Sequence, residues 1–283
     1  MVKKSLSRIY LAIIFLFLYL PIGVLIVLSF NNSLSRVKWG GFTTEWYRNL
    51  VSDPTIMNAF YTTILITVAS SVIATIIGTM AAIGISAMRK RNRQIMLGAT
   101  NIPLLNADIV TGISLMLLFV RFTALGTSTV LIAHITFDIP YVILNVLPKL
   151  SNTSSHTYEA ARDLGATPLY AFFKIVWPDI KPGVFSGFLM AVTMSLDDFS
   201  ITYFTKGAGV NTLSTMIYTQ LRKGIIPEMY ALSTILFFLA SSDYELPQCQ
   251  GCERKVLRNE EILIFIYAYC WSPYSFRLWT ERG

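Results

Sequence analysis

Four aspartates are set within the most apolar stretches of the chain: Asp108, Asp138, Asp197 and Asp198. Insertion scales put the cost of a charged side chain at the centre of a membrane helix at about 2.5 to 3.5 kcal/mol, so such residues usually serve a function. Lysine and arginine are absent from the same depth, and the carboxylates cannot neutralise one another. The pattern therefore predicts protonation, a basic partner subunit, a water-filled cavity or a cationic substrate, and the last two suit the passage of cations.

Aromatic residues adjoin two of these carboxylates. Phe137 and Tyr141 flank Asp138, and Phe199 and Tyr203 follow Asp198. A ring face attracts a cation and a carboxylate accepts charge-assisted hydrogen bonds, so both groups suit the recognition of an amine. The alternative is that the rings are ordinary membrane-helix aromatics and that Asp108 or Asp138 caps a broken helix.

One histidine lies close to this acidic set in the sequence. His134 precedes Asp138 by four residues, which places the two side chains on one face of a helix. We expect a structural hydrogen bond between them rather than a proton relay.

The elements that must position these residues are membrane helices. The chain is 54% hydrophobic and 14% charged, with a mean hydropathy of +0.56, which excludes an ordinary soluble domain. Five apolar blocks approach or exceed the roughly 20 residues that a helix needs to cross a bilayer. They are Ile9–Phe30, Ala59–Met88, Ile95–Val120, Thr127–Leu147 and Val184–Phe204. The first is expected to be an uncleaved helix, because its apolar run is longer than that of a signal peptide.

A sixth apolar block begins at Met229 but meets Ser241, Ser242 and Asp243 after about two thirds of the length that a span requires. The sequence thus predicts an all-α polytopic membrane protein with six helices, of which the last is incomplete.

The positions of the basic residues indicate how the chain is oriented in the membrane. The net charge is +7, but the basic residues lie between the apolar blocks, so a nucleic-acid surface is not expected. The basic N-terminus and the cluster Arg89, Lys90, Arg91 and Arg93 place both segments in the cytoplasm by the positive-inside rule, and the loop from Lys149 to Lys181 follows on the same side.

The chain offers little for a metal or a nucleotide. All three cysteines lie in the tail, where Cys249 and Cys252 have no histidine at ligand spacing, since His134 and His156 lie far upstream. A phosphate-binding glycine loop is also missing. No metal and no cofactor are therefore expected.

The loop between Lys149 and Lys181 predicts a helix, a turn and a second helix. Gly165 suits a left-handed stop after the first helix and Pro168 suits the start of the next one. Small apolar residues, Ala160, Ala161 and Leu164, alternate there with polar ones, a pattern suited to insertion into a groove of another protein. The alternative is a plain surface hairpin.

The same loop resembles the EAA loop of importer-type ABC permeases. The residues that carry the resemblance are Glu159, Ala160, Ala161, Gly165, Ile175 and Pro178. The resemblance implies the type I importer fold, with residues 150–180 as a cytoplasmic coupling loop in which Glu159 to Gly165 dock in a cleft of an ATPase. ATP would then bind to that ATPase and not to this chain.

Further stretches are similar to the permease subunits of spermidine/putrescine importers, among them Tyr19-Leu-Pro-Ile, Asp108-Ile-Val, His134-Ile-Thr-Phe and Ser195-Leu-Asp-Asp. This resemblance implies an inner-membrane subunit that moves polyamines by alternating access. It also implies a second homologous permease, a cytoplasmic ATPase homodimer and a periplasmic polyamine-binding protein as partners.

Two alternatives accompany this reading. One is a permease of the same build for another cationic solute. The other is an intramembrane aspartyl enzyme, which is disfavoured because adjacent aspartates diverge by about 100° on a helix. We expect no enzyme activity.

The resemblance covers Ile9 to about Leu239. Residues 1–240 are therefore expected to form the transmembrane permease domain, and residues 241–283 an atypical tail, for which a frameshift in the source gene is the preferred hypothesis.

Overall fold

Helices build the part of the chain that the structure describes. The computed structural model covers residues 2–33, 38–152, 155–223 and 227–238, with the side chains of 10–33, 38–151, 157–222 and 227–238. Within these ranges the only strand-like feature is an isolated β-bridge between Asn31 and Phe42. The all-α prediction is confirmed. The helices are α1 Val2–Ser29, α2 Glu45–Ser52, α3 Pro54–Ser86, α4 Lys90–Leu105, α5 Asp108–Phe122, α6 Thr127–Asn152, α7 Ser155–Asp163, α8 Pro168–Ala171, the π-helical turn η1 Phe172–Val176, α9 Trp177–Asp197, α10 Ser200–Thr205, α11 Leu213–Lys223 and a helix over 227–238.

Four of the described helical segments are long and apolar enough to cross a membrane: Tyr10–Ser29, Pro54–Ser86, Thr127–Ser151 and Pro168–Asp197. The pair α4 and α5 adds a fifth if the two helices count as one span. The sixth predicted block is helical over 227–238, and its continuation, together with the predicted tail and its cysteines, lies outside the described residues.

The prediction of one helix over Ile95–Val120 is wrong. Helix α4 ends at Leu105, α5 begins at Asp108, and the two are bent by 101°. Asn106 and Ala107 between them have extended backbones. Asparagine side chains compete with the backbone for hydrogen bonds and so favour such breaks. The break places Asp108 in the first turn of α5, close to the position that the capping alternative anticipated, but the cap position itself is occupied by Ala107.

The prediction of one span over Val184–Phe204 is also wrong at both ends. The helical path starts at Pro168 and ends at Asp197, and Asp198 is extended before α10. The reason is that the Asp198 carboxylate accepts the backbone N–H groups of Ile201 and Thr202, which starts a new helix. Asp197 and Asp198 therefore lie at a helix end and not well inside a span.

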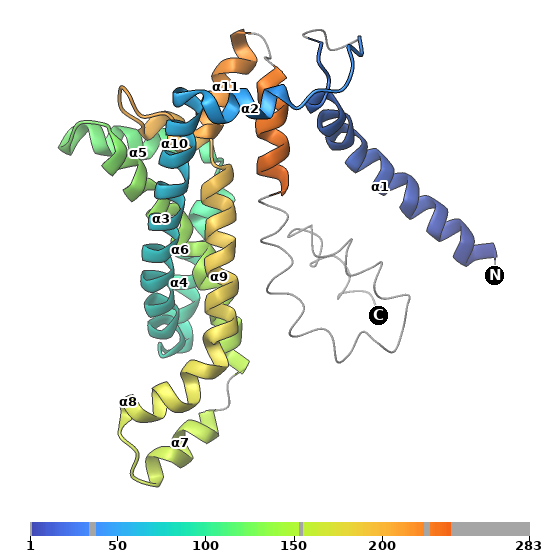
Figure 1. Cartoon of the computed structure of the whole chain (residues 1–283). Coiled ribbons are helices and arrows are strands. Elements are labelled where there is room, and N and C mark those ends of the chain that lie inside the picture. The colour runs from blue at the N-terminus through green and yellow to red at the C-terminus, as the bar shows by residue number, and fades with distance from the viewer. Residues whose placement is uncertain (1, 34–37, 153–154, 224–226, 239–283) are drawn as a thin grey trace. The chain divides into compact units, whose positions relative to one another are not determined.

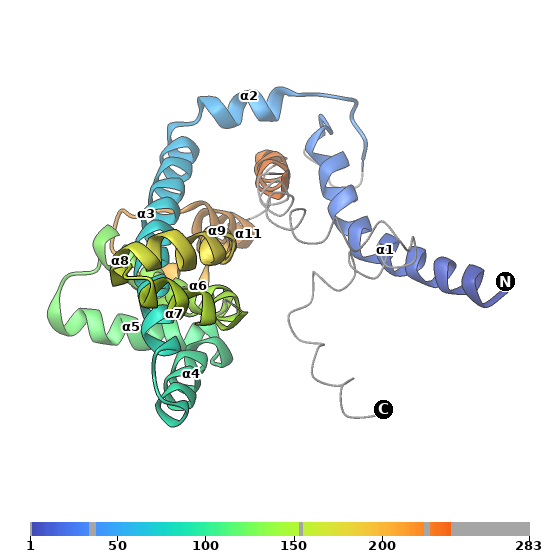
Figure 2. The ribbon, with the colours of Figure 1, turned by 90° about the horizontal axis from the view of Figure 1, so that it is seen from below.

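Helices α3, α6 and α9 pack closely because small residues let their backbones approach. Val142 of α6 is fully buried, and Gly78 of α3 and Gly187 of α9 both lie against it. A Cβ added at Gly78 would lie 2.8 Å from the Val142 Cβ, and one at Gly187 would lie 3.3 Å from its Cα. Figures 1 and 2 show these helices side by side.

We expect Gly78→Val to lower the free energy of unfolding of the purified protein in detergent by about 1–3 kcal/mol, the usual cost of overpacking. The cause is the contact with Val142, which leaves no room for a branched side chain. Gly84→Val on the same helix is the matched control, because an added Cβ there meets nothing within 4 Å. Equal unfolding curves for both variants would contradict this account of the packing.

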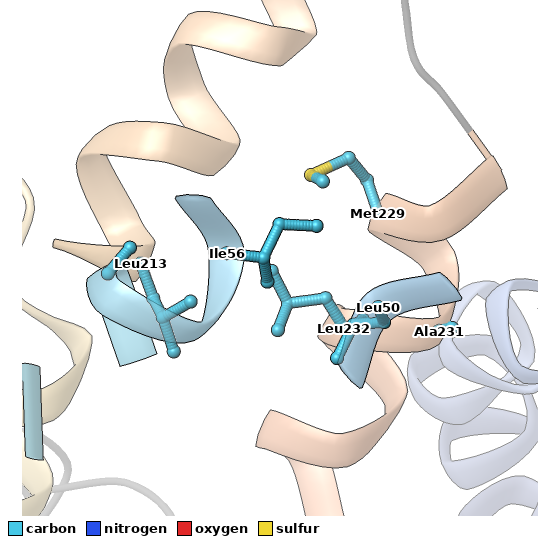
Figure 3. Close-up of a cluster of buried hydrophobic side chains, with 7 residues drawn as sticks. Leu50, Ile56, Leu213, Met229, Ala231 and Leu232 are labelled. Carbon is cyan, nitrogen blue, oxygen red and sulfur yellow. The ribbon is translucent and has the colours of Figure 1, made fainter. Parts of the chain in front are cut away.

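A second buried cluster joins segments far apart in the sequence (Figure 3). Leu50 of α2, Ile56 of α3 and Leu213 of α11 meet Met229 and Leu232 of the helix over 227–238. The start of the sixth apolar block is thus part of the core, as the predicted six-helix arrangement requires.

Candidate functional site: the exposed loop and the break at Asp198

The loop after α6 forms the predicted helix, turn and helix. Gly165 has φ +90°, and its N–H donates to the Arg162 carbonyl at 3.0 Å while the Ala166 N–H donates to the Ala161 carbonyl at 3.1 Å. These two bonds are those of a Schellman motif, which ends a helix with a left-handed residue. The left-handed stop predicted at Gly165 is confirmed.

The second short helix also starts where the sequence predicts. Pro168 is the first residue of α8, and the Thr167 hydroxyl accepts the Tyr170 N–H at 3.4 Å. The π-helical turn η1 then leads directly into α9. Ile175 is half-buried within the turn, and Pro178 is the second residue of α9.

The loop presents its motif residues to solvent. Glu159 and Ala160 are exposed, Ala161 is half-buried and Leu164 is 88% exposed. Figure 1 shows α7 and α8 at one end of α6 and α9, whereas α5, α10 and α11 lie at the other end. The loop thus exposes most of its motif residues, and groove docking stays a prediction for it.

The break between α9 and α10 is organised by Asp198. Its Oδ1 accepts the Ile201 N–H at 3.1 Å, and its Oδ2 accepts the Thr202 N–H at 2.8 Å and the Thr202 hydroxyl at 2.9 Å. The Ser214 hydroxyl donates to the Asp198 carbonyl at 2.9 Å and ties α11 to the break. The side chain is only 5% exposed, so Asp198 is a buried negative charge with three donors.

A second carboxylate lies beside this buried charge but open to solvent. Asp108 is exposed, and its charge interacts with that of Asp198. Helix α5, which carries Asp108, packs on α10, where Gly112 lies against the backbones of Ser200 and Ile201. Asp108 and Asp198 are thus an accessible and a buried carboxylate whose charges interact, and the charge of Asp138 also interacts with that of Asp198.

Aromatic rings from the segments that follow the break lie close to one another. Phe199 stacks near Tyr218 of α11 with ring centroids 4.3 Å apart, and Tyr203 lies 5.3 Å from Phe199. Two cations of the chain already lie over these rings, with Arg222 Cζ 5.1 Å from the Tyr218 centroid and Lys206 Nζ 6.0 Å from the Tyr203 centroid. Partial burial lowers the pKa of Lys206. The rings are therefore oriented so that their faces attract cations.

His134 and Asp138, whose side chains are both described, do not form the predicted hydrogen bond with each other. His134 Nδ1 lies 2.7 Å from the Ser195 hydroxyl, and Nε2 lies 2.8 Å from the Thr202 hydroxyl. Asp138 Oδ2 instead accepts the Ser70 hydroxyl at 3.2 Å. The direct bond fails because α3 and α9 place hydroxyls between the two side chains.

The aromatic neighbours of Asp138 are core residues. Phe137 is buried with Phe119, Ala133 and Ile201, and Tyr141 packs against this cluster. Asp138 is 0% exposed. The structure therefore buries Asp138 and Phe137, whereas Asp197 is exposed at the end of α9. Asp108 and Tyr203 are exposed as well, and with the half-buried Phe199 we call them the open group around Asp108.

Sequence reasoning missed Tyr218 and the hydroxyls of Ser70, Ser195 and Thr202. Tyr218 lies outside the six apolar blocks, and serine and threonine are too common in membrane helices to stand out. The Asp198 and Thr202 spacing of four residues is the one usable signal, because it is typical of a capping pair. In the described part of the chain, no cluster of three or more His, Cys, Asp or Glu could hold a metal ion.

Solved structures of transporters share this fold. One chain of a bacterial alginate ABC transporter in complex with an alginate pentasaccharide-bound periplasmic protein matches with a TM-score of 0.67 at 13% identity, over 91% of this chain and 96% of that one. Another chain, from a bacterial ABC transporter that imports the acidic polysaccharide alginate, matches with a TM-score of 0.62 at 16% identity, over 87% and 95%. The expected importer-permease fold is confirmed.

Relatives of known function match in sequence as well. The chain is 34% identical over 241 residues to the spermidine/putrescine transport system permease protein PotC of Escherichia coli (strain K12), covering 85% of this chain and 91% of the relative. It is 37% identical over 230 residues to the putrescine transport system permease protein PotI of the same strain, covering 78% and 82%.

The model of one protein family, the binding-protein-dependent transport system inner membrane component, matches residues 74–242. That range contains both parts of the site, the exposed loop after α6 and the break at Asp198. With such relatives matched over most of their length, the chain belongs to the family of binding-protein-dependent transport system inner membrane components.

Proposed function

We propose that this chain is the permease subunit of an ATP-driven polyamine importer and that the open group around Asp108 lies on the substrate path. The observation that carries the proposal is an exposed carboxylate, Asp108, whose charge interacts with that of a buried one. Its helix, α5, packs on α10, which carries the Tyr203 ring with a cation over its face. The names of PotC and PotI, which are permeases for spermidine/putrescine and putrescine, support the same substrate class.

The chemistry suits a flexible chain of amines. Asp108 is free to accept charge-assisted hydrogen bonds from an ammonium group, and the Asp198 charge beneath it adds long-range attraction. Tyr203 is 43% exposed and offers a ring face to a second ammonium or to the methylenes between them. Asp197, exposed at the end of α9, extends the acidic surface. Such weak and repeated contacts let a solute bind and leave again.

The exposed loop would supply the coupling to ATP. Glu159 to Gly165 would dock in a cleft of a cytoplasmic ATPase homodimer, with Ile175 and Pro178 fixing the loop to α9. A second homologous permease would complete the pathway, and a periplasmic binding protein would deliver the polyamine on the opposite side. With the loop inside, the N-terminus is cytoplasmic, as the basic clusters also predict.

Competition between solutes tests the substrate class. The assay is uptake of labelled spermidine by bacteria that lack their own copy of this subunit, produce this chain and supply the other components. We expect an excess of unlabelled spermidine or putrescine to suppress the uptake, and sulfate or a neutral sugar to leave it unchanged. Suppression by magnesium ions but not by putrescine would instead favour a permease for another cation.

A further inference from the structure

A continuous chain of hydrogen bonds joins the buried carboxylates on the two sides of His134. From His134 Nδ1 it runs to Ser195 Oγ at 2.7 Å, on to Ser70 Oγ at 3.1 Å and then to Asp138 Oδ2 at 3.2 Å. From Nε2 it runs to Thr202 Oγ1 at 2.8 Å and then to Asp198 Oδ2 at 2.9 Å. The four residues on the first branch and Thr202 are all buried.

The Asp198 branch fixes one proton of the imidazole. An ionised carboxylate only accepts, so the Thr202 hydroxyl donates to Asp198 and must itself accept from His134. Nε2 therefore carries a hydrogen. It lies 3.6 Å from Asp198 Oδ2, close enough for the carboxylate to stabilise a positive imidazole.

The Asp138 branch contains three contacts, and its two hydroxyls supply two protons. A third proton is needed to fill every contact, and it has two places to bind. If the third proton is on Nδ1, the imidazolium donates to Ser195, Ser195 donates to Ser70, and Ser70 donates to an ionised Asp138. If the third proton is on Asp138 Oδ2, each of these hydrogen bonds is donated in the opposite direction and the imidazole is neutral. Ser70 also lies 3.1 Å from the Thr67 carbonyl, which competes for its hydrogen without adding a proton.

We propose that His134 and Asp138 share one proton through Ser195 and Ser70, and that a cation arriving at Asp108, within the field of Asp198, moves this proton from His134 to Asp138. The Nδ1–H bond breaks, Ser195 takes that proton and passes its own to Ser70, and Ser70 passes its own to Asp138. The net charge of His134, Asp138 and Asp198 stays at −1 throughout. Before the transfer the positive imidazole offsets the charge of Asp198, and the excess negative charge is on Asp138. After the transfer the charge of Asp198 is no longer offset, and it attracts the cation at Asp108.

The surroundings supply opposing influences of the kind that a movable proton requires. Asp198 attracts the proton to His134, whereas Asp138 Oδ1 is buried without a hydrogen-bond partner, which makes an ionised Asp138 costly. Helix α3 has no charged side chain, and from α5 the nearest carboxylate is Asp108, which acts through Asp198. The inference rests on the proposed function only for the identity of the cation.

Two spectroscopic measurements on the assembled transporter follow the proton. Nitrogen-15 NMR of labelled histidine in this chain gives the fraction of His134 with a protonated Nδ1, and the resonances of the only other histidine are assigned by their loss in His156→Gln. Infrared absorption of the protonated carboxyl group, assigned by its loss in Asp138→Asn, gives the fraction of protonated Asp138. The amide introduced by Asp138→Asn can still donate to Ser70, so this variant keeps the chain of bonds.

We expect the two fractions to sum to one at neutral pH. Asp198→Asn, which removes the facing charge but keeps an acceptor, should lower the Nδ1 fraction and raise the carboxyl fraction by the same amount, and saturating spermidine should do so in the unsubstituted chain. Both groups protonated, neither protonated, or fractions unmoved by Asp198→Asn would overturn the inference. A response to Asp198→Asn without one to spermidine would support the shared proton and contradict the proposed substrate.

Discussion

Replacing Gly165 by valine is expected to lower spermidine uptake at least about tenfold while leaving the amount of chain in the membrane unchanged. Gly165 has φ +90°, a left-handed conformation that costs a non-glycine residue about 1–2 kcal/mol and a β-branched residue more. The strain is relieved only by breaking the two hydrogen bonds that end α7, which turns Glu159 to Asp163 away from α8. Since about 1.4 kcal/mol is a factor of ten in an equilibrium, docking on the ATPase should fail.

Asparagine at the same position is the matched control. It tolerates the left-handed conformation better than any branched residue, so Gly165→Asn should keep most of the uptake. Membrane levels are measured by immunoblot of the inner-membrane fraction, and docking by co-purification of the ATPase. Normal uptake by Gly165→Val, or equal losses in both variants, would contradict the assigned role of this turn.

Asp108→Asn should raise the KM for spermidine uptake by about 10- to 100-fold. Hydrogen bonds to a charged group contribute about 1.5–3 kcal/mol, which corresponds to this range. Asp108 is exposed and Ala107 occupies the cap position of α5, so the amide should not disturb the start of this helix. The measurement is the concentration dependence of initial uptake rates, with protein levels matched.

Two further variants separate charge from shape. Asp108→Glu keeps the carboxylate and should restore most of the affinity, whereas Glu45→Gln removes an exposed carboxylate from α2 and should have no effect. An unchanged KM in Asp108→Asn would remove this residue from the substrate path. A loss shared equally by Asp108→Glu would point to side-chain shape instead of charge.

The parts of the molecule that sequence predicts well are those set by local chemistry. The apolar blocks identify the helices, because a run of about twenty apolar residues is typical of a helix that crosses a membrane. The turn at Gly165 and the start at Pro168 follow from the backbone preferences of glycine and proline. These features need no knowledge of which helices are neighbours.

The helix breaks were not predictable in the same way. Hydropathy is averaged over a block. A single polar residue inside the block, such as Asn106 or Asp198, therefore lowers the mean hydropathy slightly but does not indicate that the helix ends there. The hydrogen bonds of Asp198 to Ile201 and Thr202 show that the polar residue itself creates the new helix start. Sequence reasoning considered a cap at Asp108 or Asp138 and overlooked Asp198.

The grouping of the carboxylates depends on tertiary packing. Asp138 and Asp198 look equivalent in sequence, since each adjoins two aromatic residues. The structure buries Asp138 against Ser70 of α3, and it places Tyr218 of α11 beside Phe199. Neither neighbour is close in sequence to the residue that it contacts, so periodicity alone cannot pair them.

Accumulation of labelled spermidine in proteoliposomes tests the central claim most directly. The vesicles contain this chain assembled with its companion permease and ATPase, enclose ATP, and receive the binding protein with spermidine outside. We predict accumulation that requires ATP and is lost when this chain is left out. Vesicles in which the ATPase is bound and hydrolyses ATP, but in which spermidine never exceeds its equilibrium level, would contradict the assignment of this chain to polyamine import.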